Sequence, residues 1–351
     1  MEPLLLTLII SFGLAILLTR SVKIWTVKQS IIDEPGELRK VHKQSVPLLG
    51  GLAIFITFSL VAIGLATFTP YLIGKAVGQL ELVGLILGGG IIMFGGYLDD
   101  RYHKTPQSQI VWPILAALAV LLSGINVYVV TNPFGGGLIE LGALSSPVLT
   151  FLWLMGMMYT TKLLDGLDGL ASGVGAIGGL IIFCLTQFTP FYEPPVGLLA
   201  ITLAGACLGF LVWNWYPAKI FLGEGGSLYI GFILGVLAII SGAKIATTLL
   251  VMGVPALDVA WVILRRLFWE KKSLASADRK HLHYRLLDVG FSHRQAVLIL
   301  YLVTACFGFT SLFLGTRGKV AALSILLLTM VILGVWIVKR YKRIQKKTQA
   351  F

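Results

Sequence analysis

Long apolar runs alternate along the chain with short segments that are rich in charged residues and glycine. A helix needs about 20 mostly apolar residues to cross the hydrocarbon core of a bilayer. The pattern predicts an all-α polytopic membrane protein with eleven transmembrane helices, near residues 3–20, 47–69, 80–97, 108–123, 147–163, 169–188, 194–211, 226–241, 244–265, 295–315 and 319–338. Only residues 241–243 separate the eighth of these helices from the ninth.

One segment between these runs has a different pattern. Residues 126–141 are too polar and too rich in glycine to cross the membrane. Two short apolar runs flank an Asn-Pro turn there, which is typical of paired strands. We expect a small β-hairpin on the extracytoplasmic surface.

The distribution of Lys and Arg predicts the orientation of the helices. Cytoplasmic loops carry an excess of these residues. If the loop after the first helix is cytoplasmic, 24 of the 28 Lys and Arg residues fall on that side. The amino terminus is therefore expected outside and the carboxyl terminus inside. Residues 1–340 would form a single transmembrane domain, and residues 341–351 a basic cytoplasmic tail.

Composition supports the assignment to membrane proteins and limits the kinds of partner that the protein is expected to bind. The chain has 351 residues and is 57% hydrophobic and 13% charged, whereas soluble domains carry about 25% charged residues. The formal net charge is +12. Basic loops that set topology and attract anionic lipid or phosphate explain that charge. The expected partner is therefore the lipid bilayer, and no nucleic acid.

Asp and His residues gather near the predicted cytoplasmic face, which the rule for Lys and Arg does not require. Asp99 and Asp100 close the third helix as adjacent carboxylates. Such a pair is costly to desolvate unless a divalent cation or cationic neighbours relieve the repulsion. A solvated helix end explains this pair equally well.

Two further segments carry carboxylates beside glycines. Asp165 and Asp168 lie three residues apart, so a helical turn would place both on one side. Asp168 could instead cap the next helix, which accounts for one carboxylate but not for two. Glu224 lies in a glycine-rich turn that leads into another helix. That arrangement suits a phosphate group or a hard cation.

His281 and His283 lie in the longest predicted cytoplasmic loop, among basic residues that include Arg279. Two His residues two positions apart share a face only in an extended segment. With cationic neighbours and no nearby Cys, they look more like a phosphate clamp than a zinc site. A loop that merely sets orientation is the alternative. Arg39 and His42, before the second helix, add cationic groups at the same face.

The carboxylates and the basic residues are expected at one depth of the bilayer. Carboxylates, a hard metal ion and surrounding cations suit phosphoryl transfer, in which catalysis consists largely of positioning and charge neutralisation. The five candidate carboxylates are Asp99, Asp100, Asp165, Asp168 and Glu224.

The sequence resembles the polyprenyl-phosphate N-acetylhexosamine-1-phosphate transferases, a membrane family that includes phospho-MurNAc-pentapeptide translocase. The eleven helices and the His-Leu-His stretch are more similar to the N-acetylglucosamine-1-phosphate branch. The segments that carry the resemblance occur in family order over most of the chain: RKVHKQSVPLLGG (39–51), GGYLDDR (95–101), DGLDGLASG (165–173), NWYPAKIFLGEGGS (214–227), PALDVAWVILRR (255–266) and DRKHLHYRLLDVGFSHRQ (278–295).

The resemblance implies a reaction, a metal and a set of site residues. A polyprenyl phosphate, such as undecaprenyl phosphate, would attack the β-phosphate of a UDP-N-acetylhexosamine at the cytoplasmic face of the cell membrane and release UMP. Magnesium is the implied metal, with manganese as an alternative. Asp99, Asp100, Asp165 and Asp168 would be catalytic, and Glu224, Asp99 and Asp165 would hold the metal. The implied substrate-binding residues are Lys162, Asn214, His281, His283, Arg279, Arg39 and His42.

The sequence departs from the family pattern at the site. Glu224 replaces an Asp, Tyr159 and Lys162 replace two Asn, and Tyr284 replaces a His. A lysine usual after the Asp pair is missing, and Gln107 stands in that segment. One hypothesis is that Lys162 supplies the missing cation, and that a lysine at position 107 would restore activity without it. The alternative is that Lys162 only sets orientation.

Two other functional classes stay open from the sequence. A diverged homologue would bind polyprenyl phosphate or sugar nucleotide without turnover. A transporter would carry charges at mid-membrane and an internal repeat, and the sequence has neither feature. Oligomeric state is also open, with a homodimer as one alternative.

Overall fold

The computed structural model describes residues 2–35, 44–74, 77–102, 104–132, 135, 137–242, 245–270 and 280–348, and most of them are helical. Two small antiparallel sheets complete the fold. The elements in chain order are α1 (Glu2–Lys28), β1 (Ile32–Asp33), β2 (Val46–Pro47), α2 (Gly51–Phe68), α3 (Gln79–Tyr102), α4 (Pro106–Gln109), α5 (Val111–Leu122), β3 (Val129–Thr131), β4 (Leu138–Glu140), α6 (Ser145–Leu164), α7 (Leu170–Phe188), α8 (Pro194–Asn214), α9 (Gly223–Ile240), α10 (Ile245–Val251), α11 (Gly253–Arg265), the π-helix η1 (Arg266–Glu270), α12 (Leu282–Asp288), α13 (His293–Thr310) and α14 (Thr316–Thr348).

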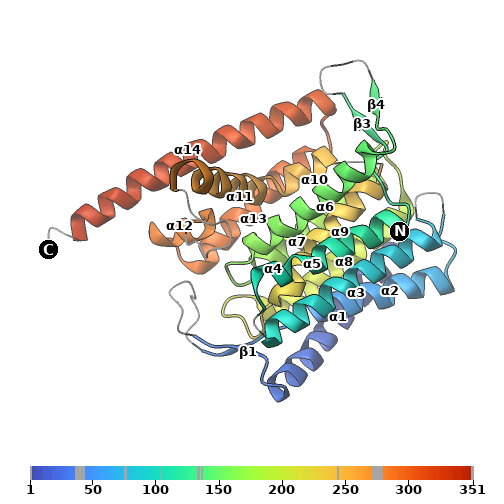
Figure 1. The fold of residues 1–351 in the computed structure, drawn as a ribbon, viewed down its shortest axis with the longest axis horizontal. Helices are drawn as coiled ribbons and strands as arrows, with labels where there is room; N and C mark the ends of the chain where they lie inside the picture. Colours follow the sequence, from blue (N-terminus) through green and yellow to red (C-terminus); the bar gives the residue numbers. More distant parts are fainter. Residues whose placement is uncertain are drawn as a thin grey trace.

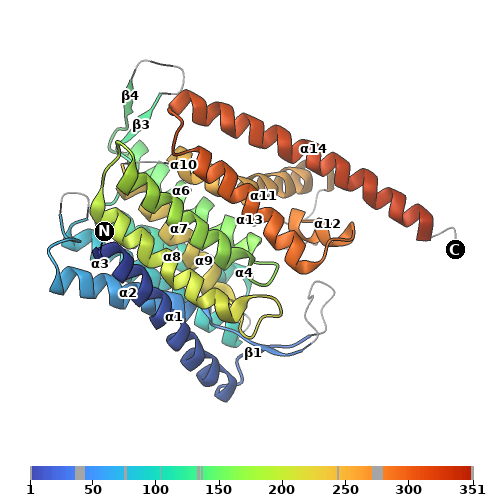
Figure 2. The ribbon, with the colours of Figure 1, turned by 180° about the vertical axis from the view of Figure 1, so that it is seen from behind.

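The helices form a bundle with its small elements at two opposite ends. The β3–β4 pair lies at one end, while β1, α4 and α12 lie at the other (Figures 1 and 2). The long helix α14 lies on the opposite side of the bundle from α1, α2 and α3 (Figure 1). Helices α3 and α6 finish at the end with β1, and α7 and α9 start there. Residues far apart in the sequence therefore meet at one end of the bundle.

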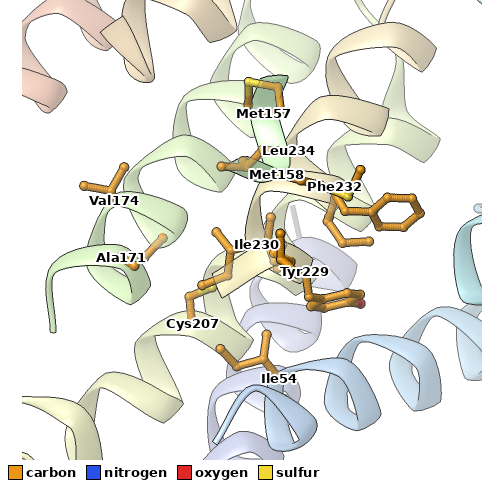
Figure 3. Close-up of a cluster of buried hydrophobic side chains, with 14 of the residues drawn as sticks. Ile54, Met157, Met158, Ala171, Val174, Cys207, Tyr229, Ile230, Phe232 and Leu234 are labelled. Carbon is orange, nitrogen blue, oxygen red and sulfur yellow. The ribbon is translucent and has the colours of Figure 1, made fainter. Parts of the chain in front are cut away.

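Helix α9 is the centre of the bundle. After Ser227 it is apolar all round, and 83% of its 18 residues are buried, the largest share among the candidate membrane spans. A helix without a polar face is expected inside a protein or a membrane. Figure 3 shows the surrounding core, in which α9 side chains meet residues of α2, α6, α7 and α8: Ile54, Met157, Met158, Ala171, Val174, Cys207, Tyr229, Ile230, Phe232 and Leu234.

Glycines bring three helix backbones together where α9 begins. A Cβ atom on Gly51 of α2 would overlap with Gly226 of α9, and one on Gly96 of α3 would overlap with Gly225. Small residues at helix interfaces permit this close approach in membrane proteins. The first turn of α9 is therefore held between α2 and α3.

The sequence-based helix count differs from what the structure supports. Every predicted span coincides with helical structure, but among the described residues eight helices are long and apolar enough to cross a membrane, or nine if α10 and α11 form one bent span. The pair is bent by 79° at Met252, and Pro255 follows closely, where its ring cannot continue a preceding helix. Helices α4 and α5 together form a shorter apolar segment. A count of eleven stays a prediction.

The two sheets lie at opposite ends. In the segment where a hairpin is expected, β3 pairs with β4, and Val130 faces Ile139. The sequence pattern did not predict the second sheet, in which Asp33 of β1 faces Val46 of β2. The chain after β2 is bonded to the loop before α9, because the Phe221 N–H donates to the Pro47 carbonyl and the Gly50 N–H to the Phe221 carbonyl, both at 2.8 Å.

Candidate active site

A polar cavity of about 600 Å³ lies at the end of the bundle where α9 begins. Its walls come from β1, α3, the α3–α4 loop, α4, α6, the α6–α7 loop, the end of α8, the α8–α9 loop, α9, α12 and α13. All five predicted carboxylates line it. The charged and polar lining residues are Asp33, Asp99, Asp100, Lys104, Gln109, Lys162, Asp165, Asp168, Asn214, Glu224, Ser227, Tyr284 and His293.

Asp99 and Asp100 are both buried at the end of α3, with 9% of each exposed. The Gln109 amide donates to both oxygens of Asp99, at 2.9 and 3.0 Å. The Glu224 backbone N–H donates to Asp100 Oδ1 at 3.2 Å. Asp100 Oδ2 is buried without a hydrogen-bond partner among the described residues. A buried carboxylate oxygen without a partner is costly.

Glycine is required at position 223 beside this carboxylate. Gly223 has a φ of +74°, a conformation that other residues adopt only with strain. A Cβ atom there would also overlap with Asp100 Oδ2. Gly223 therefore lets the Asp100 side chain reach the first turn of α9.

Lys162 links the carboxylates of two helices. Its ammonium lies 2.8 Å from Glu224 Oε2 and donates to Gln109 Oε1 at 3.1 Å. Because Gln109 also contacts Asp99, the contacts run from Asp99 through Gln109 and Lys162 to Glu224. Lys162 is thus a part of the cavity wall in direct contact with a predicted metal ligand.

The α6–α7 loop supplies the other two carboxylates. Burial, together with the negative charges of Glu224 and Asp168, raises the pKa of Asp165 to about 8. The Asp165 side chain faces the cavity but is otherwise surrounded by protein, so it is only partly exposed. Asp168 Oδ2 accepts a hydrogen bond from the Ala218 N–H at 2.9 Å. Negative charge in excess of the nearby cations is what a bound divalent ion would relieve.

Asn214 joins this loop to the end of α8. Its carbonyl accepts from the Gly169 N–H at 3.1 Å and from the Ser172 hydroxyl at 2.9 Å, and its amide donates to the Ile220 carbonyl at 3.0 Å. The side chain is 3% exposed. The structure therefore gives Asn214 internal partners, which position two loops of the cavity, and its contact with substrate stays a prediction.

The paired histidines lie behind the cavity wall instead of in the cavity. His281 Nδ1 lies 2.8 Å from Asp258 Oδ2, and the rings of His281 and His283 stack at 5.6 Å. The His283 ring packs on Gly166, where a Cβ atom would overlap with it. Burial and the neighbouring His281 and His293 lower the pKa of His283 to about 3. A neutral, buried His283 supports the Asp165 loop, and the predicted phosphate clamp would require another arrangement.

The structure adds residues that the sequence pattern missed. Gln109, Lys104 and His293 line the cavity, and the His293 ring stacks on Tyr216 at 4.2 Å. Gln109 lies in the same segment as Gln107, where the family lysine is missing. The helical turn α4 points Gln109 inward, whereas Gln107 is exposed. Position 109, and not position 107, is therefore the one that reaches Lys162.

Three predicted substrate-binding residues cannot be placed. Arg39, His42 and Arg279 lie outside the described residues. Of the remaining predicted site residues, Asp99, Asp100, Asp165, Asp168, Glu224, Lys162 and Asn214 line one cavity, while His281 and His283 do not.

The oxygen atoms that line the cavity can be compared with the coordination preferences of Mg²⁺. Hard carboxylate oxygens are suitable ligands. Within the described ranges, no three Asp, Glu, His or Cys side chains converge on a point that could hold an ion. Mg²⁺ is commonly held by one or two carboxylates, with substrate phosphates and water completing its shell. The residues present therefore fit an ion that enters together with a diphosphate.

The candidate membrane spans of the bundle, with a carboxylate-lined cavity at one end, define a multi-pass membrane protein. The model of glycosyl transferase family 4 matches residues 82–242, which include most of α3 together with Asp165, Asp168 and Glu224.

Comparison with known proteins gives a narrower assignment. The Bacillus subtilis protein named probable undecaprenyl-phosphate N-acetylglucosaminyl 1-phosphate transferase is 32% identical over 314 residues, which cover 87% of this chain and 83% of that protein. Decaprenyl-phosphate N-acetylglucosaminephosphotransferase of Mycolicibacterium smegmatis is 36% identical over 308 residues, or 80% and 74% of the two chains. Phospho-N-acetylmuramoyl-pentapeptide-transferase of Shouchella clausii is 30% identical, over 89% and 97%. The chain therefore belongs to the polyprenyl-phosphate N-acetylhexosamine-1-phosphate transferase family.

Proposed function

We propose that the protein transfers N-acetylglucosamine 1-phosphate from UDP-N-acetylglucosamine to a polyprenyl phosphate such as undecaprenyl phosphate, releases UMP and depends on magnesium. The product is a sugar linked to the lipid through a pyrophosphate, which would start cell-wall or surface polysaccharide synthesis. One observation carries the proposal: five carboxylates and Lys162 line a single cavity at one end of a membrane-protein bundle. The names of the relatives support the sugar and the lipid acceptor.

The reaction exchanges one phosphorus–oxygen bond for another. A phosphate oxygen of the acceptor attacks the β-phosphorus of the sugar nucleotide. The bond from that phosphorus to the oxygen bridging the two phosphates breaks, and UMP leaves with the oxygen. Because the second pKa of a phosphomonoester is about 6, the acceptor is largely dianionic at pH 7. The protein then needs mainly to position the two phosphates and offset their charge.

The cavity residues are suited to these tasks. The Lys162 ammonium and the N-terminal turn of α9 provide positive charge for the diphosphate. A bound Mg²⁺ would supply further charge neutralisation, and one or two of the predicted ligands Glu224, Asp165 and Asp99 would hold it together with the substrate phosphates. Asp100 lies where α9 and α3 meet and orients the first turn of α9.

We place the cavity on the cytoplasmic face of the cell membrane. The argument is the excess of Lys and Arg on the loops at that end of the predicted topology. Single cysteines in a background without Cys184, Cys207 and Cys306 test this placement. A cysteine at Asn132 should react with an impermeant thiol reagent in intact cells, and one at Lys346 should not. Labelling at Lys346 alone would reverse the orientation.

A second candidate is a homologue that binds these substrates without turnover. The contact between Lys162 and Glu224 favours it, because an ammonium occupies the carboxylate that a metal would use. Purified protein in detergent with undecaprenyl phosphate, magnesium and either UDP-GlcNAc or UDP-GalNAc separates the two candidates. We expect a lipid-linked product and UMP from UDP-GlcNAc, and a rate about 10²–10³-fold lower after Glu224→Gln. Binding of both substrates without product would support the second candidate.

A further inference from the structure

Lys162 and Gln109 together engage two of the three predicted metal ligands. The Lys162 ammonium lies 2.8 Å from Glu224 Oε2, and the Gln109 amide donates to both oxygens of Asp99, at 2.9 and 3.0 Å. The Gln109 carbonyl in turn accepts from the Lys162 ammonium at 3.1 Å, so the two side chains form one connected unit. In this arrangement the protein's own side chains take up the carboxylate oxygens that a metal ion would use.

The ammonium is the group that offsets the charge of Glu224 Oε2. That oxygen is buried and makes no hydrogen bond among the described residues. A buried carboxylate without a partner is costly, so Lys162 can leave only if another cation takes its place. A metal ion can in turn reach Oε2 only after the ammonium has moved, because two positive charges at one oxygen repel each other strongly. Lys162 and a metal ion therefore compete for one oxygen atom.

Lys162 can move while the backbone stays in place. It lies in the last turn of α6, its side chain is 19% exposed, and it lines the polar cavity. A lysine carries its charge on a flexible stem of four carbons, so its ammonium can turn from one partner to another. An anion that enters the cavity, such as a diphosphate, offers the displaced ammonium a new partner of the same kind.

On the proposed function, which supplies the sugar nucleotide and the metal, we propose that Lys162 is an exchangeable counterion that makes metal binding depend on the nucleotide. Without nucleotide, the ammonium holds Glu224 Oε2. When the diphosphate enters the cavity, the ammonium moves to a phosphate oxygen and uncovers Oε2 for the divalent ion. The exchange changes no covalent bond, precedes the transfer step and requires no acceptor lipid. Nucleotide and metal share the cost of breaking one ion pair, so each raises the affinity for the other.

Metal binding without nucleotide tests the resting contact. Mn²⁺ replaces magnesium as the probe, since the loss of its free EPR signal measures binding without any turnover. Lys162→Asn should bind Mn²⁺ about tenfold more tightly than the unaltered protein, within the range of about 5–150-fold that is typical of coupled sites. An unchanged Mn²⁺ affinity in a folded Lys162→Asn protein would overturn the proposal.

Lys104→Asn is the matched control, because it removes the same charge from the same cavity. Lys104 lines the polar cavity, but its ammonium lies 5.5 Å from the Tyr102 ring and pairs with no carboxylate among the described residues. This exposed charge is screened by solvent, so its loss should change the Mn²⁺ affinity by less than about twofold. An equal gain in both variants would show general repulsion between cations and would overturn the exchange.

The coupling between metal and nucleotide tests the movement of Lys162. UDP, which carries no sugar to transfer, is titrated calorimetrically with and without Mg²⁺, and the ratio of the two affinities gives the coupling factor. Because Mg²⁺ also binds UDP in solution, variants are compared at equal concentrations. The factor should fall about tenfold in Lys162→Asn and stay unchanged in Lys104→Asn. The unaltered factor in a folded Lys162→Asn protein would overturn the proposal.

Gln109→Leu keeps the proposal testable if Lys162→Asn does not fold. It removes the carbonyl that holds the ammonium and the amide that engages Asp99, so Mn²⁺ alone should bind more tightly, and an unchanged affinity would overturn the proposal. Failure of the proposed function gives a different result. An unaltered protein that binds no UDP and forms no lipid product would refute that function, while the Mn²⁺ affinities would still show whether Lys162 shields Glu224.

Discussion

Lys162 provides the sharpest test of how this cavity works. In the structure its ammonium contacts Glu224 at 2.8 Å and Gln109 at 3.1 Å. Lys162→Asn would remove that charge while retaining a polar side chain. If Lys162 offsets the charge of the diphosphate in the transition state, its loss should lower kcat by about 10²–10³, the range measured when one stabilising donor is removed.

The expected effect on stability is much smaller than the effect on rate. The side chains of Lys162 and Glu224 are 19% and 33% exposed. Exposed ion pairs contribute about 0.2–1 kcal/mol, and breaking a buried pair costs about 3–5 kcal/mol. For this partly exposed pair we expect a loss of about 1–2 kcal/mol in the free energy of unfolding. A large rate loss with a small shift in Tm would therefore indicate a role in the site.

A second substitution makes the test specific. Gln109 contacts both Lys162 and Asp99, so Gln109→Lys in the Lys162→Asn background should return a cation to the same space and restore part of kcat. Gln107→Lys is the control, because Gln107 is exposed and does not line the polar cavity. In the unaltered background, Gln109→Lys should lower activity by placing two cations together, so the two changes would be strongly non-additive. Kinetics of Lys162→Asn equal to those of the unaltered protein, in a correctly oriented protein, would refute this reasoning.

Three other predictions concern the remaining polar residues. Glu224→Gln should lower kcat by about 10²–10³, and full activity of this variant in chelator would contradict the assigned role. Glu224→Asp should raise the magnesium concentration needed for half-maximal rate, because the shorter side chain moves the carboxylate away from its partners. The pKa of Asp165 is raised to about 8, so below that pH a cation must displace a proton, and the apparent affinity for Mg²⁺ should fall by up to about tenfold per pH unit as the pH decreases. Calorimetric titrations from pH 9 to pH 6 measure this slope. A missing slope, or the same slope in Asp165→Asn, would be inconsistent with the prediction. Asn214→Ala should lower the free energy of unfolding by about 2–4 kcal/mol, because the N–H of Gly169, the hydroxyl of Ser172 and the carbonyl of Ile220 lose a buried partner. A Tm within 1 °C of that of the unaltered protein would argue against the positioning role of Asn214.

The sequence pattern located most of the cavity because of a simple geometric rule. Successive spanning helices alternate in direction, so residues at the end of α3, at the end of α6 and at the start of α9 meet on one side of the bundle. Asp99, Asp165 and Glu224 therefore converge although they are far apart in the sequence. The rule requires only the approximate ends of apolar runs, which hydropathy gives well.

Features that depend on packing could not be predicted from the ends of the apolar runs. The bend between α10 and α11 lies within one apolar run, so hydropathy alone cannot detect it. The α4 turn decides that Gln109 rather than Gln107 faces Lys162. The partner of His281 is Asp258 on α11, and such a pairing depends on how two distant segments fold together.

The identity of the group that moves is the central claim, and a position-specific label tests it directly. UDP-GlcNAc labelled with ³²P at the β-phosphate is incubated with the purified protein, undecaprenyl phosphate and magnesium, and lipid and nucleotide are then separated. Transfer of sugar 1-phosphate predicts that the label appears in the lipid pyrophosphate while unlabelled UMP is released. Label that remains in UDP while the sugar alone reaches the lipid, or no transfer under any of these conditions, would contradict the account.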